Sequence, residues 1–368
     1  MRLCHIITTL DPGGAENHLL ALATGLDRTR FDCDVVYLKG EGRLAPRFAD
    51  AAIPVAHFDM EGPGRASSLV RKAKSLPRLV SWLRERSYDV VHTHLFKADV
   101  YGGLAAERAR VPAIVSTKHN EDQYLRKRLY RWIGKRAASK TRRVVCISEA
   151  VRKFFLDVAG LPETLLEVIP YGIDPLPPLP RSEGMSLRTE LGLPADTPLV
   201  VTIGRLTAQK GQADLIRAMA RVDPGRLLVV GQGEEEEALR ACALNCDVAE
   251  RVTFAGWRPD VRRILAACDV FCLPSRWEGF GLVLLEAMRE EKPIVATSVG
   301  AIPEVLGSTG FVVEPGDVAG LADALRQVLF NPVHGEALGK AGRRRMETEY
   351  GLARMIDRWS ALYESIAR

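Results

Sequence analysis

Short apolar runs alternate with longer stretches of helical periodicity along the whole chain. The runs contain few interleaved polar positions, which is typical of strands buried on both faces of a parallel sheet. In the first half they are residues 3–8, 35–38, 90–93, 113–117 and 144–147, and in the second half residues 199–203, 227–230, 252–254, 270–273, 294–296 and 311–313. The alternation predicts the α/β class, in which helices connect neighbouring parallel strands.

One segment interrupts this alternation, the sequence IPYGIDPLPPLP at residues 169–180. Five prolines and a glycine there suit neither a helix nor a strand ladder. The chain of 368 residues also exceeds the roughly 250 to 300 residues at which single cores stop growing. We therefore predict two doubly wound domains that face a central cleft, residues 1–174 and residues 181 onward, joined by a linker at 175–180.

The composition is that of an ordinary globular protein, with 47% hydrophobic and 26% charged residues. No apolar run reaches the roughly 18 residues that span a bilayer, and no signal-peptide core is present, so we expect a cytoplasmic protein. The seven cysteines lack a second pair at zinc-finger spacing and are expected to be reduced core thiols. A net charge of +5 gives no ground to expect nucleic-acid binding.

Candidate chemistry lies in the loops after strands, because ligands of doubly wound sheets bind at the carboxyl ends of the strands. Gly13 and Gly14 follow the first strand and open a helix, where backbone N–H groups can approach an anion closely. A plain tight turn explains the two glycines equally well. After residues 199–203, the loop GRLTAQKG carries Arg205 and Lys210, two cations that suit a diphosphate. An ordinary solvated basic loop is the alternative.

Two other short motifs argue against rival chemistries. The sequence VGQGEEEEAL at residues 230–239 contains Gly-x-Gly without a third glycine, and its run of glutamates would repel a pyrophosphate. An NAD-dependent oxidoreductase is therefore disfavoured. The Asp-x-Asp pair, Asp32 and Asp34, precedes a strand and so lies at the wrong end of the sheet for a metal–phosphate site.

The sequence SRWEGFGLVLLEAM contains two glutamates, Glu278 and Glu286. We expect a helix from about Leu282, which places Glu286 among buried neighbours where a carboxylate needs hydrogen-bond donors, such as a ribose diol. Glu278 precedes the helix and is free to hold another hydroxyl-rich group. The alternative is that Glu286 pairs with Arg289. A glycosidase pair is disfavoured, because on one helix two glutamates eight residues apart would be separated by about 12 Å, whereas glycosidase carboxylates lie about 5 to 9.5 Å apart.

Together these motifs resemble the retaining GT-B glycosyltransferases of the large fourth sequence family, the glycosyl transferases group 1. The resemblance covers nearly the whole chain and rests on GGAE, DVVHTH, IPYGID, GRLTAQKG, VVGQGEEEEAL, FAGW, the element from Ala267 to Met288 with two glutamates separated by seven residues, and VGAIPEVL. It implies two Rossmann-like domains. It also implies that the last helix, about residues 355–368, crosses back to the first domain, which leaves residues 181–354 as the nucleotide-sugar-binding domain.

The resemblance implies a role for each matching residue. Arg205 and Lys210 would neutralise the nucleotide diphosphate, Glu286 would hold the ribose, and Glu278 would hold hydroxyls of the donor sugar. His119 matches a histidine that reaches the sugar near the reacting carbon, although Lys118 and Asn120 beside it depart from the usual pattern. Further donor contacts are expected from Gly14, Gly204, Trp257, Arg258, Gly279, Phe280, Gly281, Leu282 and the region of Ile302. Gly13 and His94 are weaker candidates for the acceptor side. For His94, the usual explanation of a histidine on a buried strand is that it belongs to the core.

The implied reaction moves a hexose-type sugar from a nucleotide diphosphate to a hydroxyl group, with retention and without a cofactor or an essential metal ion. Without an evident protein nucleophile, a front-side displacement is implied, in which the leaving phosphate accepts the proton of the acceptor. A surface polysaccharide, a glycolipid and a small natural product all remain possible acceptors. A non-catalytic or epimerase-type nucleotide-sugar-binding protein of the same fold is the alternative.

A basic amphipathic helix is predicted at residues 125–143. Nine of the eighteen residues from 126 to 143 are lysine or arginine and none is acidic, and Leu125, Leu129, Trp132 and Ile133 form an apolar stripe. Leucine and tryptophan at this spacing are expected to pack on the sheet. The alternative is peripheral contact with an anionic membrane surface or an acidic lipid-linked acceptor.

Overall fold

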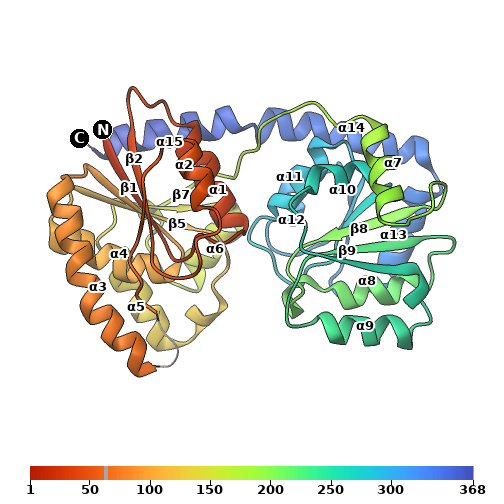
Figure 1. Ribbon diagram of the computed structural model, residues 1–368, viewed down its shortest axis with the longest axis horizontal. Coiled ribbons are helices and arrows are strands. Elements are labelled where there is room, and N and C mark those ends of the chain that lie inside the picture. The colour runs from red at the N-terminus through yellow and green to blue at the C-terminus, as the bar shows by residue number, and fades with distance from the viewer. Residues whose placement is uncertain (62–64, 368) are drawn as a thin grey trace. The chain divides into compact units, whose positions relative to one another are not determined.

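The computed structural model describes residues 1–61 and 65–367, and the chain divides into two compact units (Figure 1). The first contains Met1–Gly172 and Leu352–Arg368, and the second contains Ile173–Gly351. The expected first domain ended at residue 174, two residues after Gly172, and its C-terminal helix was expected to begin at about residue 355, three residues after Leu352. The expected linker 175–180 groups with the second unit, where the Leu179 amide donates to the Glu290 carboxylate over 2.8 Å.

The first unit is built on a parallel sheet with the strand order β3-β2-β1-β4-β5-β6-β7. Its strands are β1 (Arg2–Ile7), β2 (Asp32–Tyr37), β3 (Val55–His57), β4 (Val90–His94), β5 (Ala113–Lys118), β6 (Arg143–Cys146) and β7 (Leu166–Val168). All five apolar runs predicted in this half form strands. The edge strands β3 and β7 were missed, because each has only three residues of mixed burial and therefore contains no apolar run.

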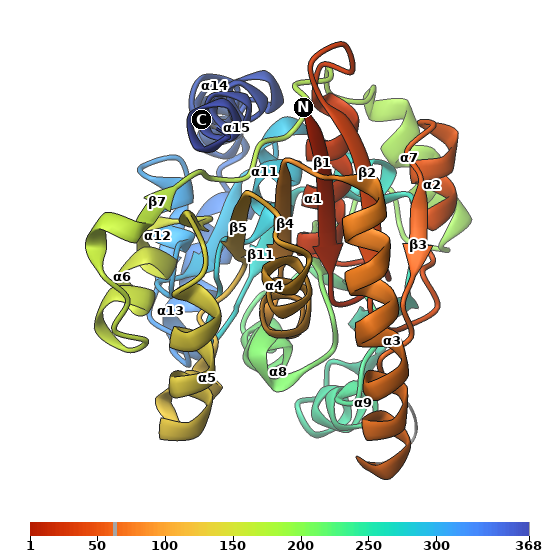
Figure 2. The ribbon, with the colours of Figure 1, turned by 90° about the vertical axis from the view of Figure 1, so that its left-hand side faces the viewer.

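Helices cover both faces of this sheet (Figure 2). They are α1 (Gly14–Gly25), α2 (Ala45–Asp50), α3 (Arg65–Arg86), α4 (Phe96–Ala109), η1 (Gln123–Arg126), α5 (Arg128–Ala138), α6 (Glu149–Asp157), η2 (Glu163–Leu165) and α15 (Leu352–Ile366). Helices α3 and α5 each pack against α4, while α15 packs against α1. The C-terminal helix thus belongs to the first unit, where its fully buried Trp359 joins the core around Leu3, Val90 and Val115.

The second unit repeats the design with the strand order β10-β9-β8-β11-β12-β13, again parallel. Its strands are β8 (Leu199–Ile203), β9 (Arg226–Val230), β10 (Val252–Gly256), β11 (Val270–Leu273), β12 (Ile294–Thr297) and β13 (Phe311–Val313). Its helices are α7 (Arg181–Glu190), η3 (Ala208–Lys210), α8 (Gln212–Met219), α9 (Glu236–Asn245), η4 (Ala249–Arg251), α10 (Val261–Ala267), α11 (Leu282–Arg289), α12 (Ile302–Leu306), α13 (Val318–Leu329) and α14 (Pro332–Glu349). The prediction of two doubly wound α/β domains is confirmed.

Each sheet has one point where the strand order reverses. In the first sheet this point lies between β1 and β4, and in the second it lies between β8 and β11. The loops that leave adjacent strands at such a point diverge to opposite sides and leave room for a ligand at the carboxyl edge. The search for a site therefore begins at the loops after these four strands.

Candidate active site

The loops after β8 and β11 carry the predicted cations and the first predicted glutamate. Val200 on β8 lies opposite Val270 on β11, so the two loops leave the sheet side by side. The first loop contains Arg205 and Lys210, and the second contains Glu278. The fold thus joins residues about seventy positions apart at the place where open α/β sheets bind ligands.

Two glycines allow these loops to approach their neighbours closely. Gly211 has a φ of +62°, and a Cβ atom there would lie 2.0 Å from the Pro274 carbonyl oxygen. Gly300 has a φ of +51°, and its Cβ would lie 1.8 Å from the Glu278 carbonyl oxygen. No other residue fits at such contacts without moving the backbone. The sequence analysis did not single out either glycine, although both follow predicted site loops.

Lys210 and Glu278 form an ion pair, which the sequence did not predict. The Lys210 Nζ atom donates to the Glu278 carboxylate, and the Ser275 hydroxyl donates to the same carboxylate over 3.2 Å. Both charged side chains are largely buried, with 17% and 11% of their surface exposed. A cation suited to a phosphate and a carboxylate suited to sugar hydroxyls therefore lie in contact.

Arg205 lies at the exposed side of the same loop. Its backbone carbonyl accepts a hydrogen bond of 3.0 Å from Gln212, which fixes the loop. Within the part of the chain that the structure describes, the Arg205 guanidinium makes no ion pair. It thus remains available to a second anionic group beside Lys210.

Glu286 lies in α11, which begins at Leu282 as expected. Loss of hydration raises the pKa of its carboxyl to about 7, against a smaller opposing effect of Arg289. The Arg289 guanidinium is bonded instead to Glu290, over 3.3 Å. Among the described residues no side chain or amide donates to the Glu286 carboxylate, so the alternative pairing with Arg289 is not formed. A partly buried carboxylate without donors is suited to a ligand that brings hydroxyl groups.

The other donor-side candidates lie in or near these loops, and most of them were expected to contact the donor through backbone groups. Trp257 is 56% exposed, whereas Arg258 is bonded to Glu190 and Asp260 over 2.9 and 2.7 Å. The Phe280 ring is buried against Tyr350, and Leu282 is the first residue of α11. Gly204 donates its amide to the end of β9, and Gly279 and Gly281 flank Phe280 in the turn before the helix. Ile302 is buried at the start of α12.

In the first unit, Gly13 and Gly14 mark the N-terminus of α1. Gly13 is the N-cap residue in extended conformation, and a Cβ atom there would lie 2.5 Å from the Glu16 carboxylate. This buried carboxylate, which the sequence analysis did not consider, thus lies against the helix start that was predicted to receive an anion. A Cβ atom at Gly14 would meet nothing within 4 Å, so the approach to its backbone is open.

Six of the seven histidines lie in the first unit, and five of them cluster there. His5 lies on β1, His92 and His94 on β4, His18 on α1 and His119 after β5. Residues two apart on a strand share a face and His5 lies opposite His92, so the sequence HTH points both of its histidines at the face that α1 and α15 cover. The sequence analysis treated His94 as an isolated core residue or a weak acceptor candidate and missed this histidine cluster.

His94 is not placed to contact an acceptor, which corrects that expectation. It has no exposed surface, and its two ring nitrogens are bonded to His5 over 3.2 Å and to His119 over 3.1 Å. His119 is partly exposed and bonds Tyr171 through its Nδ1 atom over 2.6 Å. Burial lowers the pKa of both histidines well below the usual range, so both are neutral at physiological pH.

Three members of the cluster could in principle share a metal ion. His5, His92 and His94 each bring one ring nitrogen within 4.8 Å of the others. The His92 nitrogens, however, are bonded to the hydroxyls of Tyr363 and Thr117 over 2.7 and 2.6 Å. A metal ion would have to displace these short hydrogen bonds, and no carboxylate or thiolate of the group would offset its charge.

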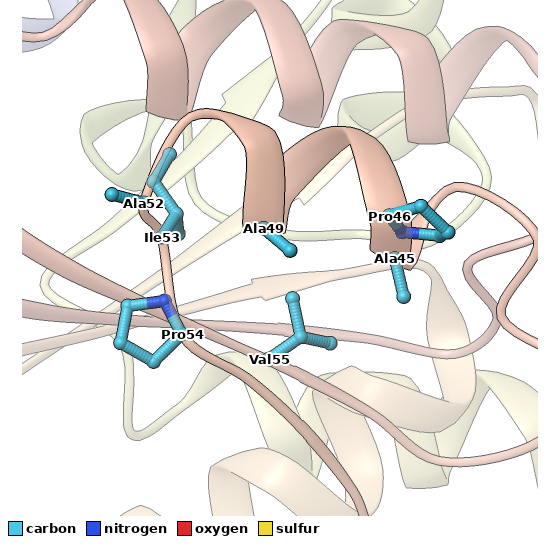
Figure 3. A pocket seen from close by; sticks show the side chains of 7 residues that line it. All are labelled: Ala45, Pro46, Ala49, Ala52, Ile53, Pro54 and Val55. Carbon is cyan, nitrogen blue, oxygen red and sulfur yellow. The ribbon is translucent and has the colours of Figure 1, made fainter.

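A surface hollow lies elsewhere on the first unit, between α2 and β3 (Figure 3). It is lined by the apolar side chains of Ala45, Pro46, Ala49, Ala52, Ile53, Pro54 and Val55. None of these residues can titrate or bind a phosphate. The hollow has none of the chemistry found at the strand-order reversals.

The predicted basic helix is shorter than expected and less buried. It consists of η1 and α5, which ends at Ala138. Leu125 is buried as expected, but Leu129 and Trp132 are 65% and 66% exposed. The expectation that the whole apolar stripe packs on the sheet is therefore wrong, because its second and third positions are exposed. No helix in residues 1–61 and 65–367 has the length and apolar character needed to cross a membrane.

Comparison with known proteins identifies the family of the chain. Residues 12–175 match the family model described as Glycosyltransferase Family 4, and residues 197–331 match that of Glycosyl transferases group 1. An alpha-maltose-1-phosphate synthase of Mycobacterium tuberculosis is 31% identical over 75% of this chain and 79% of its own length. A UDP-Gal:alpha-D-GlcNAc-diphosphoundecaprenol alpha-1,3-galactosyltransferase of Escherichia coli is 28% identical over 92% of this chain and 90% of its own length.

The same relationship appears in solved structures. The crystal structure of Anabaena Alr3699/HepE in complex with UDP-glucose superimposes with a TM-score of 0.89 at 26% identity, covering 99% of this chain and 100% of that one. WaaG, a glycosyltransferase involved in lipopolysaccharide biosynthesis, gives a TM-score of 0.78 at 18% identity over 99% of both chains, which shows the shared fold. On these grounds the chain is a glycosyltransferase of the GT-B fold and belongs to the glycosyl transferases group 1, sequence family 4.

Proposed function

We propose that this nucleotide-sugar glycosyltransferase transfers a hexose with retention of its anomeric configuration to a hydroxyl acceptor. The observation that carries the proposal is the contact between Lys210 and Glu278 at the reversal of strand order, with Arg205 beside it. Such a site joins cations for a diphosphate to a carboxylate for sugar hydroxyls. Solved relatives described as complexes with UDP and with UDP-glucose support a donor of this class.

In the proposed reaction, Arg205 and Lys210 stabilise the negative charge that develops on the diphosphate as the sugar leaves. Glu278 and the backbone of Gly279 and Gly281 hold the hydroxyls of the sugar, while Glu286 accepts hydrogen bonds from the ribose diol. The acceptor hydroxyl attacks from the face of the leaving phosphate, which takes the proton. Two protein cations at the diphosphate fill the role that a metal ion has in other transferases, so we propose that no metal is required.

Backbone around Gly204, Trp257 and Arg258 would surround the nucleotide base. From the first unit, we propose Gly14 beside the donor phosphates and the acceptor, and His119 at the sugar. A neutral imidazole suits a sugar that gains positive charge in the transition state, because an imidazolium would repel it. Burial keeps the pKa of His119 well below its usual range, in support of this role.

Water can replace the unidentified acceptor in a test of retention. UDP-glucose, UDP-galactose, GDP-mannose and ADP-glucose would be incubated separately with the protein in excess EDTA, and the released sugar would be followed by proton NMR before mutarotation. We expect release from one donor, with the α configuration of the donor preserved and the rate unaffected by EDTA. Initial release of the β anomer would contradict retention, and loss of activity in EDTA would contradict metal independence.

We also propose that α5 docks on an anionic bilayer. Leu129, Tyr130 and Trp132 are exposed, and the cations around them include Lys127 and Arg128. Within the described chain neither cation makes an ion pair, so their charge is available to acidic headgroups. Relatives named for undecaprenol-linked and phosphatidylinositol acceptors support a surface of this kind.

The docking surface predicts co-sedimentation with vesicles that contain phosphatidylglycerol and weak sedimentation with neutral phosphatidylcholine. A variant with Leu129→Ser and Trp132→Ser should lose most of the bound fraction at unchanged charge, because the apolar side chains supply the insertion. Leu244→Ser, which removes an equally exposed leucine from α9, is the matched control. Equal sedimentation of wild type and the double variant would contradict the proposal.

A further inference from the structure

Gln209 joins the two loops of the candidate donor site. It lies in η3 within the first loop, residues 204–211, and its Nε2 atom donates to the Trp277 carbonyl in the second loop, residues 274–281, over 2.9 Å. In the opposite direction, the Arg276 amide donates to the Gln209 carbonyl over 2.7 Å. Because a carbonyl oxygen can only accept, the amide nitrogen of Gln209 must face it. A single residue thus binds the second loop through both its side chain and its backbone.

The side-chain bond lies directly beside the charged groups of the site. Gln209 precedes Lys210 in the sequence, and Trp277 precedes Glu278. The bond between the two preceding residues therefore sets how far apart the loops carry the Lys210 ammonium and the Glu278 carboxylate. This bond is partly buried, and hydrogen bonds are stronger where the surroundings are less polar than water.

Two other contacts of these loops are less suited to hold this spacing during turnover. The ion pair between Lys210 and Glu278 joins the groups that would bind phosphate and sugar, so a bound donor competes with it. The pair between Arg276 and Asp214 spans 3.2 Å, but 52% of the Arg276 side chain is exposed, and exposed pairs contribute little. The Gln209 bonds engage backbone groups of the second loop that take no part in the proposed contacts with the donor.

We infer that Gln209 is a positioning residue that sets the distance between the Lys210 cation and the Glu278 carboxylate. This rests on the proposed roles of Lys210 at the diphosphate and Glu278 at the donor sugar. The bond that breaks in a nucleotide sugar lies between the two groups that these side chains would hold. An error in their spacing therefore acts on the reacting bond, and a misplacement of about 1 Å costs roughly a hundredfold in rate.

The effect of Gln209 should depend on the ligand. A nucleoside diphosphate without a sugar would use the cations of the first loop and leave Glu278 unused, so the spacing of the loops has little influence on its binding. An intact nucleotide sugar would contact both loops and would be sensitive to their spacing. A residue that only stabilised the fold would affect the two ligands alike, so the difference between them identifies a positioning role.

Gln209→Met tests this difference, because methionine keeps the length of the side chain and removes its hydrogen-bond donor. With the cognate donor among UDP-glucose, UDP-galactose, GDP-mannose and ADP-glucose, we expect kcat for donor turnover to fall roughly ten- to a hundredfold. The dissociation constant of the corresponding nucleoside diphosphate, measured by calorimetry, should change little. Unchanged turnover, or an equal loss of affinity for both ligands, would overturn the inference.

Gln212→Met is the matched control for the loss of a glutamine amide. The Gln212 side chain donates to the Arg205 carbonyl within the first loop and makes no bond to the second loop in the described chain. Its replacement should weaken the binding of the nucleoside diphosphate and of the intact donor by the same factor. A selective loss of donor turnover in this control, equal to that of Gln209→Met, would overturn the assignment of the effect to the spacing of the loops.

Hydrogen exchange of the wild-type protein tests the same point without any variant. The Arg276 amide, which donates to Gln209, should stay protected when saturating UDP, GDP or ADP is added, because the loops remain joined while Lys210 changes its partner. In Gln209→Met the same amide should exchange faster, since one of the two bonds that hold the loops is lost. Loss of protection in the wild type on nucleotide binding would show that the loops separate, and it would overturn the inference.

A double-mutant cycle tests whether Gln209 acts through Glu278. In the Glu278→Gln background, Gln209→Met should cause little further loss of donor turnover, because the carboxylate that it positions is already absent. Fully additive losses would overturn the positioning role. Unchanged turnover in Glu278→Gln alone would refute the proposed role of Glu278 itself. A normal loss in Glu278→Gln beside an unaffected Gln209→Met would overturn only the inference about Gln209.

Discussion

Replacement of Lys210 by methionine is expected to lower kcat for donor turnover by roughly a hundredfold to a thousandfold, the loss seen when one donor to a developing oxyanion is removed. The same change should abolish thermal stabilisation by the cognate nucleoside diphosphate among UDP, GDP and ADP. For the wild type, that stabilisation amounts to about 2.7 kcal/mol at a hundred times the dissociation constant. Differential scanning fluorimetry and donor turnover measure the two effects.

The ion pair complicates this variant, because removal of Lys210 leaves Glu278 with a partly buried and unpaired charge. Loss of one partner of a buried pair costs about 3 to 5 kcal/mol. The double variant Lys210→Met with Glu278→Gln removes both charges, so we expect it to regain stability without regaining activity. Lys340→Met is the matched control, since Lys340 pairs with Glu336 on the exposed side of α14. Nucleotide stabilisation that survives in Lys210→Met would refute the assignment of the diphosphate site.

Replacement of Glu286 by glutamine is expected to raise the stability of the protein above neutral pH while it weakens donor binding. The folded-state pKa of about 7 lies above the value of an exposed glutamate near 4.5. The folded protein therefore binds the proton more tightly, and the associated stability is complete below about pH 4.5 and lost as the pH rises through 7. At about 1.4 kcal/mol per pKa unit, the difference reaches roughly 3 kcal/mol.

Urea denaturation of the wild type and Glu286→Gln between pH 5 and 9 measures this effect. The glutamine variant should lack the decline in stability that the wild type shows on the alkaline side. Its KM for the donor should nevertheless rise roughly tenfold, because an amide accepts fewer hydrogen bonds from a ribose diol than a carboxylate does. Glu291→Gln, next to α11, is the control for a general charge effect. A variant that gains no stability at pH 8 would contradict the burial of this carboxylate.

Much of the fold could be predicted from the sequence. All eleven apolar runs form strands of two parallel sheets, because strands covered on both faces need unbroken apolar segments. The start of α11 at about Leu282 was also predicted, because glycines before it favour a turn. In the structure Gly281 has a φ of +81°, which is outside the helical region, so the helix cannot begin earlier. The expected boundary at residue 174 lies two residues from that of the structure, because prolines stop both kinds of regular structure. The edge strands β3 and β7 were missed for want of an apolar run.

The candidate site could be predicted only in part. Arg205, Lys210, Glu278 and Glu286 were found from their place after strands and from their resemblance to a known family. Two features could not be predicted from the sequence: that Lys210 pairs with Glu278, and that no described residue donates a hydrogen bond to the Glu286 carboxylate. His94 was misjudged because the pattern HTH does not reveal that His5 and His119 complete its hydrogen bonds.

The sequence by itself determined the secondary structure, the two-domain organisation and the residue types available at the carboxyl ends of the strands. Only the tertiary structure decided which of those residues touch, because the order of strands in a sheet is set by packing of distant segments. It brought β8 beside β11 and β1 beside β4, and it left Leu129 and Trp132 uncovered. Periodicity shows that one face of a helix is apolar, but the neighbouring elements alone determine what covers that face.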